Sequence, residues 1–149
     1  MLDITDIGKV FPSVTAPVEK GRLRFFAKAI GESNPIYTDE AAAKKAGYES
    51  LPMPPTFLFS LKMDVPNPFE NYEKAGLALA KILHANQAFI YHKPVVAGDT
   101  LMFESHIADI YDKKGGELEF LVEKIKVSNQ FDQHVADMTI TLVVRNSTE

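Results

Sequence analysis

The residues best suited to chemistry lie together in one polar turn. Glu32, Asn34 and Tyr37 fall within six residues of the segment GESNPIY, so a single turn can present all three to one pocket. A carboxylate suits a general base and a phenol suits a proton donor. The structural alternative is a normal turn, because Asn before Pro is a common turn pair whose amide holds the loop. The turn is a candidate acid–base site with Glu32, Asn34 and Tyr37 as candidate catalytic residues.

The turn leads into a short helix and then into a buried one. Asp39 stands where a helix N-cap belongs, and residues 40–45 (EAAAKK) favour a helix that Gly47 can end. Residues 51–55 (LPMPP) cannot be regular, because their three prolines lack N–H groups. A second helix then runs from Pro55 to Met63, and its apolar surface is typical of a buried helix. A buried helix beginning beside a polar turn is a common setting for a ligand site.

The other chemistry-bearing residues are scattered along the chain. His84 and His92 flank the start of a predicted strand and can supply an imidazole if they face the turn, with structural hydrogen bonding as the alternative. His106 and His134 are expected on the surface. Because no pair of histidines has ligand spacing with a carboxylate, we expect no metal site. Phe57 is expected in the core and is also a candidate for the wall of an acyl pocket.

Composition excludes several classes of partner. The 149 residues are 46% hydrophobic, which is enough for one domain, residues 1–149, with its own core. The net charge of −4 and the pI near 5.6 leave no basic face, so no nucleic-acid partner is expected. No apolar run approaches the roughly 18 residues of a membrane span, and we do not expect the N-terminal MLDITDIGKV to act as a signal peptide. Without cysteines there is no thiolate nucleophile. We expect a cytoplasmic protein.

Hydrophobic periodicity divides the chain into a helical first half and a stranded second half. Residues 1–17 carry no clear pattern, helical spacing predicts a helix within 18–30, and 64–72 is a proline-broken loop. Residues 73–83 fit either a helix or the lead-in to a strand. Period-two alternation then predicts four strands: 87–93, 101–111, 118–127 and 135–145. We expect these strands to form an antiparallel meander with helices on one face, an α+β fold.

Three segments of the sequence resemble one protein family. GESNPIY-x-DEAAA, AGY-x-SLP-x-PPTFL and YHKPVVAGDTL resemble the MaoC-like hot-dog proteins, in particular the subgroup related to the N-terminal dehydratase domain of FAS1-like and MaoC-like dehydratases. The likeness covers about residues 18–145. It implies a hot-dog fold, in which a curved antiparallel sheet wraps a central helix, here Pro55 to Met63. It also implies that two such domains pair sheet to sheet, with the acyl-thioester site at the junction.

The resemblance also implies a substrate class. Family members hydrate trans-2-enoyl-CoA, or dehydrate (R)-3-hydroxyacyl-CoA or acyl-carrier-protein substrates, and others bind acyl chains as non-catalytic partner subunits. We therefore expect an acyl-CoA or acyl-ACP ligand, no cofactor beyond the thioester carrier, and a homodimer or a heterodimer with another hot-dog chain. The candidate substrate-binding residues are Pro55, Thr56, Phe57, His84 and His92.

The turn departs from the active members of this family at two positions. Active hydratases resemble this chain at G-D-x-N-P-[IL]-H, but Glu32 stands in place of the catalytic Asp and Tyr37 in place of the catalytic His. Asn34 and Pro35 match the motif. Glu for Asp keeps the carboxylate and moves it by one methylene. Tyr for His is the larger change, because a histidine exchanges protons at neutral pH whereas an unperturbed tyrosine is a poor base.

The helix start departs as well. Active members place a His-Gly pair there, and the glycine N–H helps to bind the thioester oxygen. Pro54 and Pro55 occupy those places, and proline has no N–H to donate. Thr56 is then the next possible oxyanion donor.

Three functions are consistent with these residues. The first is an (R)-specific enoyl-CoA hydratase or 3-hydroxyacyl-thioester dehydratase, in which Glu32 acts as base with Tyr37 or a histidine as proton partner. The second is the non-catalytic subunit of a heterodimeric dehydratase whose partner carries the intact motif. The third is an acyl-CoA thioesterase or a simple acyl-CoA-binding module, since one fold hosts many functions.

Overall fold

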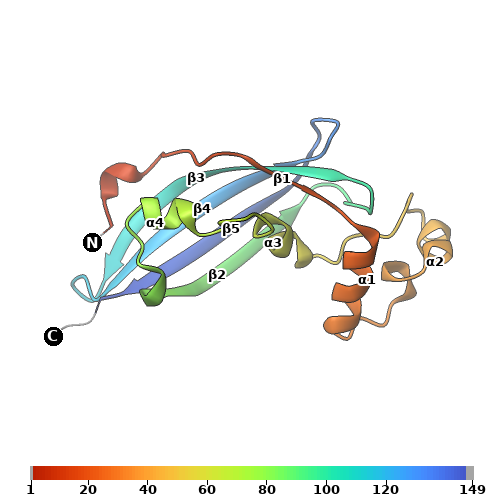
Figure 1. Ribbon diagram of the computed structural model, residues 1–149, viewed down its shortest axis with the longest axis horizontal. Coiled ribbons are helices and arrows are strands. Elements are labelled where there is room, and N and C mark those ends of the chain that lie inside the picture. Colours follow the sequence, from red (N-terminus) through yellow and green to blue (C-terminus); the bar gives the residue numbers. More distant parts are fainter. Residues whose placement is uncertain (1, 147–149) are drawn as a thin grey trace.

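A five-stranded antiparallel sheet with a short helix against it is the frame of the computed structural model, which describes residues 2–146. Figure 1 shows α3 and α4 on one face of the sheet, and α1 and α2 grouped beyond one end of it. The elements are η1 (Ile4–Asp6), β1 (Val14–Pro17), α1 (Lys20–Ala29), η2 (Pro35–Tyr37), α2 (Glu40–Lys45), α3 (Phe57–Lys62), α4 (Glu70–Lys74), η3 (Leu79–Lys81), β2 (Ile82–Tyr91), β3 (Thr100–Lys113), β4 (Leu118–Ser128) and β5 (His134–Arg145).

The strand order corrects one part of the predicted topology. The sheet runs β1-β3-β4-β5-β2, with every neighbouring pair antiparallel. Three strands, β3 to β5, form the expected meander. The expected fourth member, β2, pairs with β5 and not with β3, because residues 92–99 carry the chain to the far edge instead of turning back. The short strand β1 was not expected, and it pairs with β3 as an edge strand that ends at Pro17.

The α1 and α2 helices confirm the local predictions. The α1 helix lies within the predicted range and buries Leu23 and Ala27. The α2 helix begins after Asp39, whose carboxylate Oδ1 accepts a hydrogen bond from the Ala41 N–H at 2.8 Å. Gly47 follows this helix with a φ of +95°, the left-handed conformation in which glycine carries no steric penalty.

The capping role of Asp39 predicts a stability effect. Replacing Asp39 with Ala should lower the free energy of unfolding by about 1 kcal/mol, because the Ala41 N–H loses its acceptor. Asp39→Asn is the matched control, since its amide oxygen can still cap the helix. Urea denaturation followed by circular dichroism measures both variants, and equal losses in the two would contradict the capping role.

The α3 and α4 helices differ from the predicted bounds. The α3 helix begins at Phe57 rather than Pro55, because the prolines keep the preceding segment irregular, and it buries Leu58 and Leu61. The α4 helix takes up the end of the segment expected to be a loop. The β2 strand begins at Ile82, before the predicted start at residue 87. The prediction missed its first half because these residues are mostly exposed and lack alternation. Within residues 2–146, no helix is long and apolar enough to cross a membrane.

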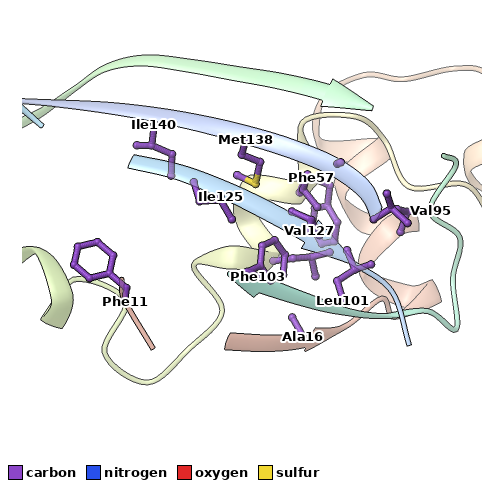
Figure 2. Packing of buried hydrophobic residues seen from close by; sticks show 14 of the residues in the cluster. Phe11, Ala16, Phe57, Val95, Leu101, Phe103, Ile125, Val127, Met138 and Ile140 are labelled. Atoms are coloured by element: carbon purple, nitrogen blue, oxygen red, sulfur yellow. The ribbon is translucent and has the colours of Figure 1, made fainter. Parts of the chain in front are cut away.

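The core lies between α3 and the inner face of the sheet. Figure 2 shows buried side chains from β3, β4 and β5 in one cluster with Phe57. Phe103, Ile125 and Met138 are at most 1% exposed. Such residues alternate with more exposed ones along β3 and most of β4, which places one face of the sheet against α3 and the other toward solvent. Residues 140–144 of β5 are buried without alternation.

Candidate functional site

The side chains of the polar turn bind mainly to their own backbone. Glu32 Oε1 accepts a hydrogen bond from the Asn34 N–H at 2.8 Å, and Asn34 Oδ1 accepts one from the Ile36 N–H at 3.2 Å. The second of these caps the 3-10 turn Pro35–Tyr37. Both Glu32 and Asn34 are exposed. These contacts hold the loop in shape and give both residues a structural role.

Tyr37 is half-buried, and its surroundings keep it protonated. Burial raises the pKa of the Tyr37 phenol above its ordinary value, and the nearby Glu32 carboxylate and Tyr48 raise it further. At neutral pH the phenol therefore keeps its proton: it can donate a hydrogen bond, but it is a poor proton donor and does not act as a base.

A pocket of about 330 Å³ lies beside Tyr37, at the entry to α3. It brings together three residues singled out in the sequence, namely Tyr37, Pro55 and His92. The Tyr91 hydroxyl closes one side by donating a hydrogen bond to the carbonyl oxygen of Pro55. The remaining lining residues were not expected in the site: Tyr48, Pro52, Met53, Tyr91, Lys93, Pro94 and Val95. Most belong to the AGY-x-SLP-x-PP and YHKP segments, so motif position was the signal that could have found them.

The other five candidates do not line this pocket: Glu32, Asn34, Thr56, Phe57 and His84. Thr56 is exposed and does not line it. Phe57 is 4% exposed and packs against Phe26, with ring centroids 4.9 Å apart. The Phe57 N–H donates to the carbonyl oxygen of Pro54 at 3.0 Å, so it is already occupied and offers nothing to an oxyanion.

A second, apolar pocket of about 600 Å³ lies at the other end of α3. Its walls come from α3, the following loop, α4, η3, β2 and β5: Phe59, Met63, Pro68, Phe69, Tyr72, Leu79, Ile82, His84, Ile140 and Leu142. His84 borders this pocket, where its ring lies 5.2 Å from that of Phe59 and its Nε2 lies 3.1 Å from the Asn86 carbonyl oxygen. His84 lies in β2 and His92 directly follows it, so the two are about 27 Å apart at about 3.4 Å per residue of strand. They therefore border different pockets.

Three metal-ligating side chains that the sequence spacing did not group lie close together in the structure. His92, His134 and Asp137 each place one ligand atom within 4.8 Å of the other two. The sequence could not indicate this cluster, because it depends on the pairing of β2 with β5. His134 is exposed, as expected.

Comparisons with known proteins define first the class and then the family. A curved antiparallel sheet around an apolar helix is the hot-dog fold. A solved MaoC-like dehydratase matches with a TM-score of 0.84 and 22% identity, covering 95% of this chain and 43% of that chain. The HadBC (3R-hydroxyacyl-ACP dehydratase) complex from Mycobacterium tuberculosis matches with a TM-score of 0.74 and 27% identity, covering 94% of this chain and 97% of that chain. The chain belongs to the FAS1-like dehydratase domain family, whose dehydratase domain region it matches over residues 5–138.

Relatives of similar length support this assignment. The UPF0336 protein of Streptomyces avermitilis is 35% identical over 150 residues, covering 99% of this chain and 98% of the relative. That of Streptomyces coelicolor is 36% identical over the same shares of both chains. The fold and family expected from the three sequence segments are thereby confirmed.

Proposed function

We propose that this chain is the acyl-thioester-binding subunit of a two-chain (R)-3-hydroxyacyl-thioester dehydratase. Its partner is a hot-dog chain that carries the intact D-x-N-P-[IL]-H motif. The observation that carries the proposal is that neither candidate acid–base side chain of the polar turn is arranged for proton transfer. The Glu32 carboxylate accepts a hydrogen bond from its own loop, and the Tyr37 phenol has a raised pKa. Neither is arranged to exchange a proton with substrate at neutral pH.

The position of His92 supports the same conclusion. His92 is the one histidine that lines the pocket beside Tyr37, and its Nε2 lies 2.6 Å from the Asp137 carboxylate rather than toward Glu32. Reversible hydration needs a base and an acid around one water molecule. The turn offers a carboxylate that accepts a hydrogen bond from its own loop and a phenol whose pKa is raised.

The two pockets at the ends of α3 support a binding role. The pocket beside Tyr37 is polar at its rim, where Lys93 and His92 offer nitrogen atoms to a thioester head group. The pocket beyond Met63 is lined almost entirely by apolar side chains and suits an acyl chain. The six residues of α3 span roughly 9 Å at about 1.5 Å per residue, so the two pockets at its ends are separated by less than the length of a medium-chain acyl group.

The exposed edge strand β2 is evidence for association with a second chain. Within the described residues it is a long edge strand that pairs with β5 alone, and it exposes Leu83 and Ile90 at 60% and 61%. An unpaired apolar edge favours association, and a second hot-dog sheet can extend it. The HadBC complex, 27% identical to this chain, is a dehydratase of two different chains.

The decisive experiment compares the chain alone with the chain and its partner. We expect no hydration of crotonyl-CoA or longer enoyl-CoAs by the purified chain, followed by ultraviolet loss of the enoyl thioester. Adding a motif-bearing hot-dog chain should give turnover at least about 100-fold above either chain alone, because acid–base catalysis contributes this much. Light scattering should give a stable complex of the two chains.

Variants separate this proposal from a self-sufficient hydratase. In the complex, Glu32→Ala and Tyr37→Phe should leave kcat within about threefold, whereas loss of the partner's motif aspartate should abolish it. Turnover by this chain alone that vanishes in Glu32→Ala would overturn the proposal and identify a hydratase with a rewired acid–base pair. Release of free coenzyme A from saturated acyl-CoA would instead identify a thioesterase.

A further inference from the structure

Three side chains, two from β5 and one from the residue that follows β2, meet on the solvent-facing side of the sheet. His92 Nε2 lies 2.6 Å from Asp137 Oδ2, and His134 Nε2 lies 2.8 Å from Asp137 Oδ1. The two imidazole rings have centroids 4.4 Å apart. One carboxylate therefore holds two imidazoles whose ring nitrogens converge on the same point.

A β-bulge in β5, and two hydrogen bonds to a carbonyl within it, bring these side chains together. Residues three apart in a regular strand point to opposite faces, so His134 and Asp137 should not meet. The register of β4 with β5 shifts here by one residue, and Val135 and Ala136 are both buried, so the bulge turns His134 to the face of Asp137. The Val135 carbonyl accepts from the His92 N–H at 2.8 Å and from the following N–H at 3.2 Å. These bonds fix His92 above the bulge.

The geometry points to a surface site for one divalent transition-metal ion at His92, His134 and Asp137. Two imidazoles and a carboxylate are the donor set of zinc and of neighbouring imidazole-binding ions, and three protein ligands leave a fourth position for water or a ligand. Hard ions such as Mg²⁺ prefer oxygen ligands and match the donor set poorly.

The distances leave room for an ion after a small adjustment. Ligand atoms about 2.0–2.1 Å from a tetrahedral zinc ion lie about 3.3 Å apart. Each N···O contact must therefore lengthen by roughly 0.5–0.8 Å from its hydrogen-bonded value. The three side chains are 38–42% exposed, so they can move by this amount without disturbing the core.

The local charge is compatible with a cation. Burial acts to raise the pKa of Asp137, but hydrogen bonds from His92 and His134 outweigh it and hold the pKa below its usual value. The carboxylate is therefore ionised at neutral pH. Lys126 lies opposite Asp137 in the β4–β5 register. Its Nζ lies 3.9 Å from Glu104 Oε2 on β3, so the charge of this lysine is paired with a second exposed carboxylate.

A bound ion would act as a clamp between two strands. His92 follows β2, whereas His134 and Asp137 belong to β5, so shared coordination joins the end of the edge strand to its neighbour. His92 also lines the pocket beside Tyr37, which places the clamp at the rim of the candidate site. The inference does not depend on the proposed function.

Calorimetric titration with zinc chloride tests the site. The chain is prepared without a histidine tag, stripped with chelator and titrated at neutral pH. We expect one saturable zinc site and no comparable binding of Mg²⁺. His134→Gln and Asp137→Asn should each weaken zinc binding by at least about 100-fold, since loss of even an outer-shell partner costs 10- to 100-fold. His106→Gln removes an exposed histidine outside the cluster and should leave binding unchanged.

Thermal melts provide an independent measurement. Zinc should raise the Tm of the unsubstituted chain and of His106→Gln, but not of His134→Gln, because an ion that binds only the folded state stabilises it. Melts in chelator check that each variant is folded, and His92→Gln replaces any variant that is not. Absence of saturable binding, or zinc affinity equal in His134→Gln and His106→Gln, would overturn the proposal.

Discussion

Replacing Lys62 with Met should lower the free energy of unfolding by about 3–5 kcal/mol, because it leaves a buried carboxylate without its counter-charge. Lys62 closes α3 and is 9% exposed, and Glu123 on β4 is fully buried. Lys62 Nζ lies 2.8 Å from Glu123 Oε2, which also accepts a 2.5 Å hydrogen bond from the Tyr72 hydroxyl. Burial, then the charge of Glu123, raises the pKa of Tyr72, so the phenol remains a donor.

Two further variants test this network. Adding Glu123→Gln to Lys62→Met should recover at least half of the loss, because it removes the uncompensated charge and keeps an acceptor for Tyr72. The matched control is Lys74→Met, which breaks an exposed ion pair with Glu70 and should cost under about 0.5 kcal/mol. Urea denaturation at neutral pH measures all three. A double variant less stable than Lys62→Met would contradict the buried ion pair.

Replacing Phe57 with Ala should lower the free energy of unfolding by about 3–5 kcal/mol, the usual cost of removing a buried aromatic ring. The ring packs against Phe26, and the guanidinium of Arg22 lies 5.5 Å from its centroid. Figure 2 shows it beside the sheet residues of the core. This expected loss of stability follows if Phe57 acts as a core residue, which is the first of the two roles predicted for it.

Phe25→Ala is the matched control, because Phe25 is 75% exposed on α1. It should change the free energy of unfolding by less than about 0.5 kcal/mol. Urea denaturation again provides the comparison. Similar stabilities for the two alanine variants would show that the Phe57 ring does not contribute to the core. A Phe57→Ala variant of nearly full stability that lost acyl binding would favour the pocket role instead.

Much of the fold followed from local signals in the sequence. Period-two alternation predicted β3, β4 and β5, because these strands have one buried and one solvated face. Asp39, Gly47 and the prolines before Phe57 predicted where helices begin and end, since each acts on backbone groups within a few residues. Three motif segments indicated the family, although two of their expected catalytic residues are replaced.

The sequence also placed the polar turn, because the side chains of Glu32 and Asn34 act on amides two residues away. It could not specify the pocket beside Tyr37. That pocket depends on Tyr91 reaching the Pro55 carbonyl across 36 residues. The same limit explains why His84 and His92, both candidates to supply an imidazole if they faced the turn, lie at different pockets.

Tertiary structure alone decided the contacts between segments that are distant in the chain. The partner of β2 is chosen by the path of residues 92–99, and this choice brings His92 to His134 and Asp137. Helix packing on the sheet likewise joins Lys62 to Glu123. Spacing in the sequence carries no record of such pairs, because they form only when non-adjacent strands and helices pack together.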